Sequence, residues 1–391
     1  MLPQVRYLAT PRAAMTAVFI AYGIGSGLWA GSIPSVMRNA AIDSLMLGLG
    51  ITFYGIAYVM VMSSGGTLAR FASNRAIILI SLPLVALTGS LLLLSASRLW
   101  FLTTLVLFGA AQGVLDLFMN AEASYVESDL KRPIFTSFHA AASAGMALFA
   151  LIGSLIMADA SPLWTAAILC IGMLMMGIFA ARRLPARYSA MARISPASPA
   201  PRLTPLIILG LAAGLAIAGE TAAIMWSAKL LDEQAPSLAA IAGLGTAFYG
   251  LCNTSMRLAG DTIRARFGDI ALILGSLLLA ATGFVLIGIS GSFALSTFAF
   301  ALTGLGTACV IPAIFAITAR HMTENRARGL GIVSLVAGLP RVLAPWLFGW
   351  VATQHSTSFA FGLCALAMAV ALGLILLLQL LLRRAALPVP T

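Results

Sequence analysis

Charged residues are scarce in this sequence of 391 residues. Asp, Glu, Lys and Arg together make up 9% of it, whereas 61% is hydrophobic, and the mean hydropathy is +1.02. A water-soluble domain needs a far more polar surface, so this composition excludes one. Apolar runs of about twenty residues, each able to cross roughly 30 Å of hydrocarbon, fill most of the length. Short alternating segments of the β-barrel type are missing, so the composition predicts an all-α polytopic membrane protein.

Enzyme motifs are also missing from the sequence. We find no Walker loop, no dinucleotide glycine fingerprint, no HExxH and no G-x-S-x-G in a suitable context. The four cysteines, Cys170, Cys252, Cys309 and Cys364, lie in apolar runs without metal-ligand spacing. We therefore predict neither an enzyme nor an ATP-driven pump, and we expect no metal and no cofactor.

Acidic residues are fewer than basic ones, 12 against 23, which gives a net charge of +11. If the N-terminus is cytoplasmic, every Lys and Arg except Arg38, Arg98, Lys229 and Arg341 falls in a cytoplasmic segment. This asymmetry follows the positive-inside rule. The charge therefore indicates orientation in a bilayer rather than a nucleic-acid partner, and we expect both termini to be cytoplasmic.

Twelve hydrophobic segments are expected to form membrane-spanning helices in a six–loop–six layout. They are 13–37, 45–68, 76–95, 99–123, 134–157, 162–181, 206–230, 237–259, 270–290, 293–318, 330–352 and 359–382. The stretch between the sixth and seventh holds five Arg with several Pro and Ser, as a flexible cytoplasmic linker would. We therefore predict an N-terminal bundle (1–181), a linker (182–205) and a C-terminal bundle (206–391).

An internal repeat supports two equivalent halves. The sequence GLGITFYG at Gly48–Gly55 recurs as GLGTAFYG at Gly243–Gly250, with six of eight residues identical at an offset of 195. Gly109 maps onto Gly304 at the same offset. Repeated halves are typical of secondary transporters. The first segment also carries glycines at four-residue spacing, which predicts a close helix contact, and these are Gly23, Gly27 and Gly31.

At this point the sequence resembles the major facilitator superfamily over essentially its whole length. The resemblance implies two six-helix bundles with a substrate site between them. The superfamily's signature in the loop between helices 2 and 3 has the sense G-x-L-x-D-R-x-G-R. Here GTLARFASNR keeps Gly66, Leu68 and Arg75, but Arg70 stands where the Asp belongs. The signature's role as an ionic latch is therefore not carried over to the first half.

Four segments are similar to a bacterial inner-membrane permease group of mostly unassigned substrate, itself distantly similar to fucose-type sugar–proton symporters. They are WAGSIPSV at Trp29–Val36, DLFMNAEASYVE at Asp116–Glu127, FTSFHAAASAG at Phe135–Gly145 and AGETAAIMWSAKL at Ala218–Leu230. In the symporters, an acid in helix 4 followed four residues later by Asn takes part in proton coupling, and Asp116 and Asn120 match that spacing. Their second acid, in helix 1, has no counterpart here. The resemblance implies the bacterial inner membrane.

A single carboxylate, Asp116, interrupts the fourth apolar segment. A charge near the bilayer centre costs ~2.5–3.5 kcal/mol, so this side chain should face protein or water. Gln112 and Asn120 lie four residues before and after it, on the same helical face. Burial disfavours an ionised carboxyl, so Asp116 is the expected proton site, with Gln112 and Asn120 as substrate contacts. The alternative is a polar stripe that joins two helices.

His139 should lie at the same depth as Asp116 on the next helix. We expect the two side chains to be in contact, as a proton relay or as a pair that fixes orientation. The alternative for His139 is a hydrogen bond between helices.

Glu220 and Arg341 are the deepest charges expected in the second half. They could form an ion pair across the bundle, or anchor a hydroxylated or anionic substrate. Pro340 and Pro345 flank Arg341 and should free backbone carbonyls there. The remaining candidate substrate contacts are aromatic or polar residues whose alternative role is packing, and these are Trp29, Tyr54, Trp226, Tyr249 and Asn253, the last continued by Arg257.

We therefore predict a secondary transporter that works by alternating access, acts as a monomer, and imports a small polar solute such as a sugar or polyol with protons. The alternative is proton-driven export of a metabolite or drug. Exporters of the superfamily commonly carry a Gly- and Pro-rich signature in helix 5, and the stretch FHAAASAGMALFALIG lacks its Pro, which favours import. A sensor without transport and an integral-membrane enzyme are weaker alternatives. The expected partners are the solute, protons and the lipid bilayer.

Overall fold

The computed structural model describes residues 2–131, 134–159, 161–186, 203–322 and 326–386, and all their regular structure is helical. The first half contains α1 (Leu2–Ala40), α2 (Ser44–Ser63), α3 (Gly65–Leu68), α4 (Asn74–Leu93), α5 (Arg98–Leu130), α6 (Phe135–Asp159) and α7 (Pro162–Ala181). The second half contains α8 (Leu203–Gln234), the 3₁₀ helix η1 (Pro236–Ile241), α9 (Leu244–Phe267), α10 (Asp269–Ile289), α11 (Phe293–Thr307), α12 (Val310–His321), α13 (Arg326–Gln354) and α14 (Thr357–Ala386).

The twelve-helix layout is confirmed. Within the described residues eleven segments are long and apolar enough to cross a membrane, and α11 with α12 counts as one of them. The twelfth helix is α9, which packs against α6, α8 and α11. Its hydropathy is low because it carries Asn253 and Arg257 in its middle and two arginines in its last turn. A helix that faces a polar interior rather than lipid has this composition.

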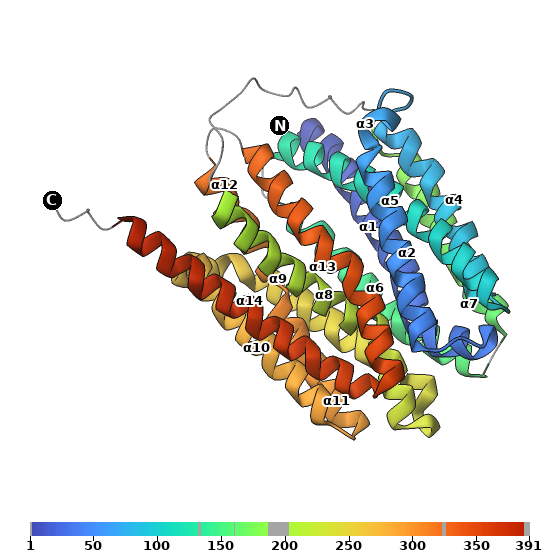
Figure 1. Ribbon diagram of the computed structural model, residues 1–391. Helices are drawn as coiled ribbons and strands as arrows, with labels where there is room; N and C mark the ends of the chain where they lie inside the picture. Colours follow the sequence, from blue (N-terminus) through green and yellow to red (C-terminus); the bar gives the residue numbers. More distant parts are fainter. Residues whose placement is uncertain (1, 132–133, 160, 187–202, 323–325, 387–391) are drawn as a thin grey trace.

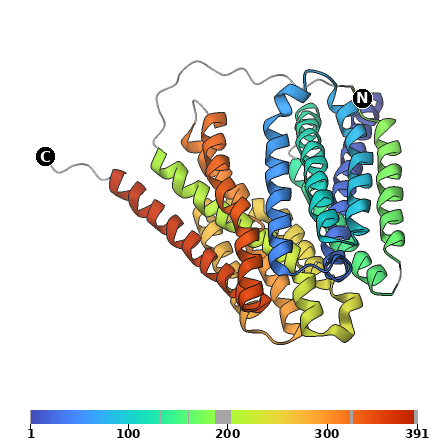
Figure 2. The same cartoon turned by 45° about the vertical axis from the view of Figure 1, so that its right-hand side comes forward.

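The helices form two groups, α1–α7 and α8–α14, that lie side by side (Figures 1 and 2). The start of α1 and the end of α14 lie on the same face of the molecule, which we call the terminal face. The two groups meet near the opposite face and diverge toward the terminal face. Most of the linker expected at 182–205 lies outside the described residues, and α8 already begins at Leu203.

Among the described residues, the hydrogen bonds and the ion pair between the two groups lie between the opposite face and the middle of the helices. Along α2 and α13, the Leu45 amide donates to Thr353 Oγ1 at 2.9 Å, and the Thr52 hydroxyl donates to the Val342 carbonyl at 3.1 Å. Gly48 lies between these residues, directly against the backbone of α13. The interface is thus closed at this end of α2.

Two further contacts lie at the same end. The Gly243 amide donates to Ser154 Oγ at 3.1 Å, which joins the start of α9 to the end of α6. Arg38 and Asp232, at the ends of α1 and α8, form an ion pair at 2.7 Å. The opposite face is therefore closed by helix backbones in direct contact, by hydrogen bonds and by the exposed ion pair between Arg38 and Asp232.

Glycines bring α1 and α6 together, as the four-residue spacing predicts. A Cβ added at each of the three glycines of α1 would collide with a backbone atom of α6. The pairs are Gly23 with Ala142, Gly27 with Met146 and Gly31 with Ala150. Gly109 and Gly304 perform equivalent tasks in the two halves. Gly109 lies against the Tyr54 carbonyl, and Gly304 lies against the Tyr249 carbonyl. The internal repeat is therefore visible in the packing itself.

Several helix boundaries differ from the expected ones. The first and seventh helices extend beyond the apolar segments 13–37 and 206–230, because a helix continues into water until a residue ends it. The fourth expected helix, which is α5, continues past residue 123 to Leu130. It ends there because Lys131 adopts a left-handed conformation, with φ 50°. The Glu127 carboxylate then accepts from the amides that begin α6, at 2.7 and 2.6 Å. The eighth, expected at 237–259, begins seven residues later, after η1.

The segment expected to be one helix over 293–318 is broken in two. The α-helical pattern stops after Thr307 and resumes at Val310. Pro312 explains the break, since it has no N–H to donate to the carbonyl of Ala308 and its ring clashes with that carbonyl. The Ala308 carbonyl instead accepts from Arg257 Nε at 3.4 Å. The break therefore supplies a backbone acceptor to a charged side chain.

Candidate functional site

A polar cavity of about 150 Å³ lies between the two groups of helices. Its walls come from α1 and α6 on one side and from α8 and α9 on the other. Its polar lining consists of Tyr22, Ser26, His139, Ser143, Glu220, Tyr249, Asn253 and Arg257. A second cavity, of about 370 Å³, shares His139 and Arg257 with it and continues along Arg264 and Phe315 on the side of the terminal face. Both halves thus contribute to one central site.

Among the described residues, Glu220 is the only acid that lines the central cavity. Its Oε1 lies 3.4 Å from Asn253 Nδ2 and 3.5 Å from Arg257 Nη2. Good hydrogen bonds of this type measure about 2.7–3.2 Å, so both contacts are long. Arg257 is held from its other side by the Ala308 carbonyl. The carboxylate and the guanidinium are thus partnered but retain capacity for further hydrogen bonds.

Hydroxyls hold the neighbouring side chains in place. The Tyr249 hydroxyl and Thr307 Oγ1 are 2.9 Å apart, and Asn253 Nδ2 lies 3.4 Å from both Thr307 Oγ1 and the Gly304 carbonyl. The close approach of α9 to α11 at Gly304 makes these contacts possible. Tyr249 and Asn253 are therefore fixed on the cavity wall by the helix behind them.

Of the two alternatives for Glu220 and Arg341, the ion pair between them is not formed, because Glu220 pairs with Arg257. Arg341 instead lies over the Tyr58 ring of the first half, 5.0 Å from its centroid. The reason is the rotation of α13, which packs on both α8 and α2. Ala337 and Pro340 lie against Gly214 of α8, so residue 341 lies on the side of α13 that faces α2. Arg341 is thus a contact between the halves.

Asp116 accepts two side-chain hydrogen bonds. The Tyr58 hydroxyl donates to Oδ2 at 2.6 Å, and Asn120 Nδ2 donates to Oδ1 at 3.0 Å. Asn120 Oδ1 lies 3.1 Å from His139 Nε2. Because Nδ2 of the amide already donates to the carboxylate, Oδ1 must accept, so His139 carries a proton on Nε2. The expected direct contact between His139 and Asp116 is therefore corrected to a contact bridged by Asn120.

Asp116 itself does not line the central cavity, whereas His139 does. The His139 ring packs at 5.1 Å from the rings of both Phe19 and Phe135, which fixes its orientation. A hydrogen-bonded chain thus runs from the cavity wall at His139 through Asn120 to the carboxylate. Such a chain can connect an acid to water in the cavity without exposing the acid itself.

Four other expected contacts lie outside the lining of the central cavity. Trp29 packs 6.2 Å from Phe101, Trp226 packs 4.6 Å from Phe348, and Tyr54 packs against Gly109. Gln112 is buried behind the wall, where its Nε2 lies 3.5 Å from Ser26 Oγ. Its Oε1 has no hydrogen-bond partner among the described residues.

Sequence reasoning did not single out Tyr22, Ser26 and Ser143 as cavity residues. Two spacings could have found them, since Tyr22 and Ser26 are four residues apart, as are His139 and Ser143. Each pair therefore shares one helix face. The sequence pattern gives Arg257 only as the continuation of the face that carries Tyr249 and Asn253. Its contact with Glu220 joins two helices, so the pattern of one helix could not reveal it. Among the described residues there is no group of three His, Cys, Asp or Glu that could hold a metal ion.

Comparisons with known proteins identify the family and the fold. The family model for the Major Facilitator Superfamily matches residues 207–390. An uncharacterized MFS-type transporter of Yersinia pestis is 30% identical over 356 residues, which cover 90% of this chain and 91% of the relative. An uncharacterized transporter of Sinorhizobium fredii is 27% identical, over 93% of this chain and 98% of the relative.

Solved structures share the fold at lower identity. The nucleoside transporter NupG superimposes with a TM-score of 0.75 at 14% identity, over 94% of this chain and 99% of that protein. FucP, in its outward conformation, superimposes with a TM-score of 0.63 at 17% identity, over 95% and 99%. The chain belongs to the major facilitator superfamily of membrane transporters.

Proposed function

We propose that this protein is a proton-coupled secondary transporter that takes up a small hydroxylated solute, such as a sugar or polyol, by alternating access. The observation that carries the proposal is the central cavity, in which an acid, a guanidinium, an amide and several hydroxyls converge from both halves. Convergent polar groups in a cleft between domains are the usual form of a small-molecule site.

The solute is proposed to bind between Glu220 and Arg257. Their mutual contact is long, at 3.5 Å, so neither group's hydrogen-bonding capacity is used up within the protein. A carboxylate accepts from solute hydroxyls, whereas a guanidinium donates to ring or hydroxyl oxygens. Tyr22 and Ser143 face the same cavity from the first half. A solute held by both halves would couple its binding to their relative position.

Asp116 is the proposed proton site. In its ionised form it accepts from Tyr58, and the ring of Tyr58 lies beneath Arg341 of the second half. Protonation of Asp116 would remove the negative charge that faces Arg341, and so weaken one attraction between the halves. Proton binding and the movement of the halves are then linked by the charge of Asp116, and the hydrogen bond from Tyr58 adjusts the strength of that link.

The conformation supports one step of this cycle. Contacts between the halves gather near the opposite face, and the larger cavity continues on the side of the terminal face. If the positive-inside rule sets the orientation, the terminal face is cytoplasmic. The structure is then the inward-facing state of a protein in the bacterial inner membrane, which the bacterial relatives also support.

Two measurements test the proposal. A thermal-shift screen of the purified protein against sugars, polyols, sugar acids and cationic drugs identifies solutes that bind. Proteoliposomes with an imposed pH gradient then measure the flux of a labelled hit. Accumulation of the solute driven by acid outside, and abolished by a protonophore, supports symport. Solute movement against the direction of proton entry supports the alternative of proton-driven export, and flux unaffected by the gradient refutes proton coupling.

A further inference from the structure

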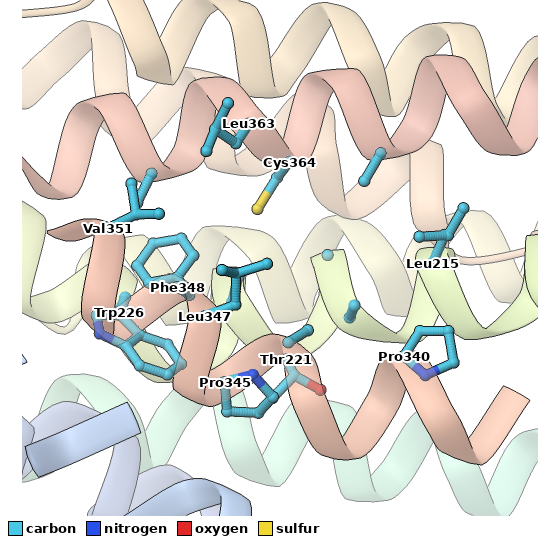
Figure 3. A pocket seen from close by; sticks show the side chains of 16 residues that line it. Leu215, Thr221, Trp226, Pro340, Pro345, Leu347, Phe348, Val351, Leu363 and Cys364 are labelled. Atoms are coloured by element: carbon cyan, nitrogen blue, oxygen red, sulfur yellow. The ribbon is translucent and has the colours of Figure 1, made fainter. Parts of the chain in front are cut away.

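A third, apolar cavity lies away from the central site, between α8, α13 and α14 (Figure 3). It has a volume of about 210 Å³ and a lining that is almost wholly apolar. Trp226 and Phe348 lie at one end, Leu215 and Pro340 at the other, and Cys364 points toward its middle. We call it the α13–α14 pocket. Its polar side-chain atoms are few, since the Thr221 hydroxyl donates to the Ile217 carbonyl and only the buried Trp226 Nε1 is without a partner among the described residues. The lining therefore favours an apolar occupant.

The α13–α14 pocket faces the bilayer rather than the central cavity. Helices α13 and α14 join at residues 355–356 and diverge toward the terminal face in both views of the molecule (Figures 1 and 2). Leu347 and Leu363, on the two sides of the pocket, are 49% and 39% exposed. The gap between the diverging helices is floored by small residues of α8, including Gly219 and Ala222. Lipid hydrocarbon is the material in contact with such an opening.

Positive charge is placed at the terminal-face ends of both helices. Arg326 and Arg328 begin α13, and Arg383 and Arg384 occupy the last turn of α14. At 1.5 Å per residue, Arg328 lies about 18 Å along α13 from Pro340 in the pocket. One leaflet contributes roughly 15 Å of hydrocarbon and several ångströms of headgroup region. A lipid whose phosphate lies near the start of α13 therefore reaches the near end of the pocket with its chain, and the arginines of α14 add positive charge on the other side of the opening.

We propose that the α13–α14 pocket binds an acyl chain of an anionic phospholipid from the leaflet at the terminal face, with the headgroup at the arginine-bearing ends of α13 and α14. Basic clusters at a membrane surface attract anionic headgroups. The site also has a structural consequence, because Pro345 lines the pocket and its carbonyl lies against Gly48 of the first half. A chain in the pocket thus supports the part of α13 that closes the interface.

Photolabelling of the purified, full-length protein tests this site. The probe is a phosphatidylglycerol with a diazirine near the end of one acyl chain, and the labelled peptides are located by mass spectrometry. We expect labels concentrated in 340–351 and 360–367. Unlabelled phosphatidylglycerol should compete roughly tenfold better than phosphatidylcholine. Equal competition by the two lipids, or labels spread evenly over all lipid-facing helices, would overturn the proposal.

Two variant pairs separate the pocket from the headgroup end. Ala367→Trp fills the pocket and should abolish its labelling. The matched control Ala369→Trp, at an exposed position two residues along the same helix, should not. The double change Arg383→Gln with Arg384→Gln should remove the preference for phosphatidylglycerol, and the exposed Arg70→Gln should leave it intact. Circular dichroism confirms that each variant is folded. Undiminished labelling of folded Ala367→Trp refutes the pocket.

Discussion

Replacement of Asp116 by Asn tests proton coupling most directly. Asn keeps the shape of the side chain and can still contact Tyr58 and Asn120, but it cannot bind and release a proton. One unit of pH gradient is worth about 1.4 kcal/mol for each proton moved, which is about a tenfold concentration ratio. With one proton per solute, the unchanged protein should therefore accumulate solute about tenfold, and Asp116→Asn should only equilibrate it.

Exchange of labelled for unlabelled solute provides the second readout. Exchange needs the halves to move but needs no net proton transfer, so Asp116→Asn should retain it. Tyr58→Phe should keep the final accumulation and change only the rate, since it removes a charge-assisted hydrogen bond worth ~1.5–3 kcal/mol and leaves the carboxyl in place. Glu122→Gln is the matched control, because Glu122 is a buried acid of the same helix that accepts from Asn74. Tenfold accumulation by Asp116→Asn would refute the assignment.

Three other perturbations have defined outcomes. The double change Leu45→Cys with Thr353→Cys should form a disulfide across the closed face, because the Leu45 amide and Thr353 Oγ1 are in hydrogen-bond contact. Oxidation should then abolish uptake and reductant should restore it. Neither single change should respond to oxidation. Pro312→Ala should let the Ala308 carbonyl accept a hydrogen bond within the helix, which raises the midpoint of thermal unfolding. Arg257 then loses this acceptor, so the thermal shift caused by a bound solute should become smaller. An unchanged solute shift would contradict that role. Gly27→Leu should destabilise the fold by more than the ~1–3 kcal/mol of ordinary overpacking, because its Cβ meets backbone, whereas Gly55→Leu points into open space and should be nearly neutral in thermal unfolding.

The site could be predicted from the sequence only in part. The i+4 spacing of Asp116 and Asn120 is a property of one helix, so their shared face follows from the sequence alone, and the structure adds the hydrogen bond between them. The bridge from Asn120 to His139 joins two helices, and their relative rotation decides which atoms meet. The partner of Glu220 likewise depends on how helices are rotated. The residue pattern within one helix cannot tell whether Arg257 or Arg341 will face its carboxylate.

What the sequence by itself determined is the architecture. The bilayer thickness sets the length of each apolar run, and the repeat at half the chain length places equivalent glycines, Gly109 and Gly304, in equivalent contacts. The tertiary structure alone decided which charges pair, because the rotation of α13 between α8 and α2 places Arg341 over Tyr58 while Arg257 remains beside Glu220. Helix length is set locally by the surrounding lipid, whereas the partners of a side chain depend on how helices far apart in the sequence cross.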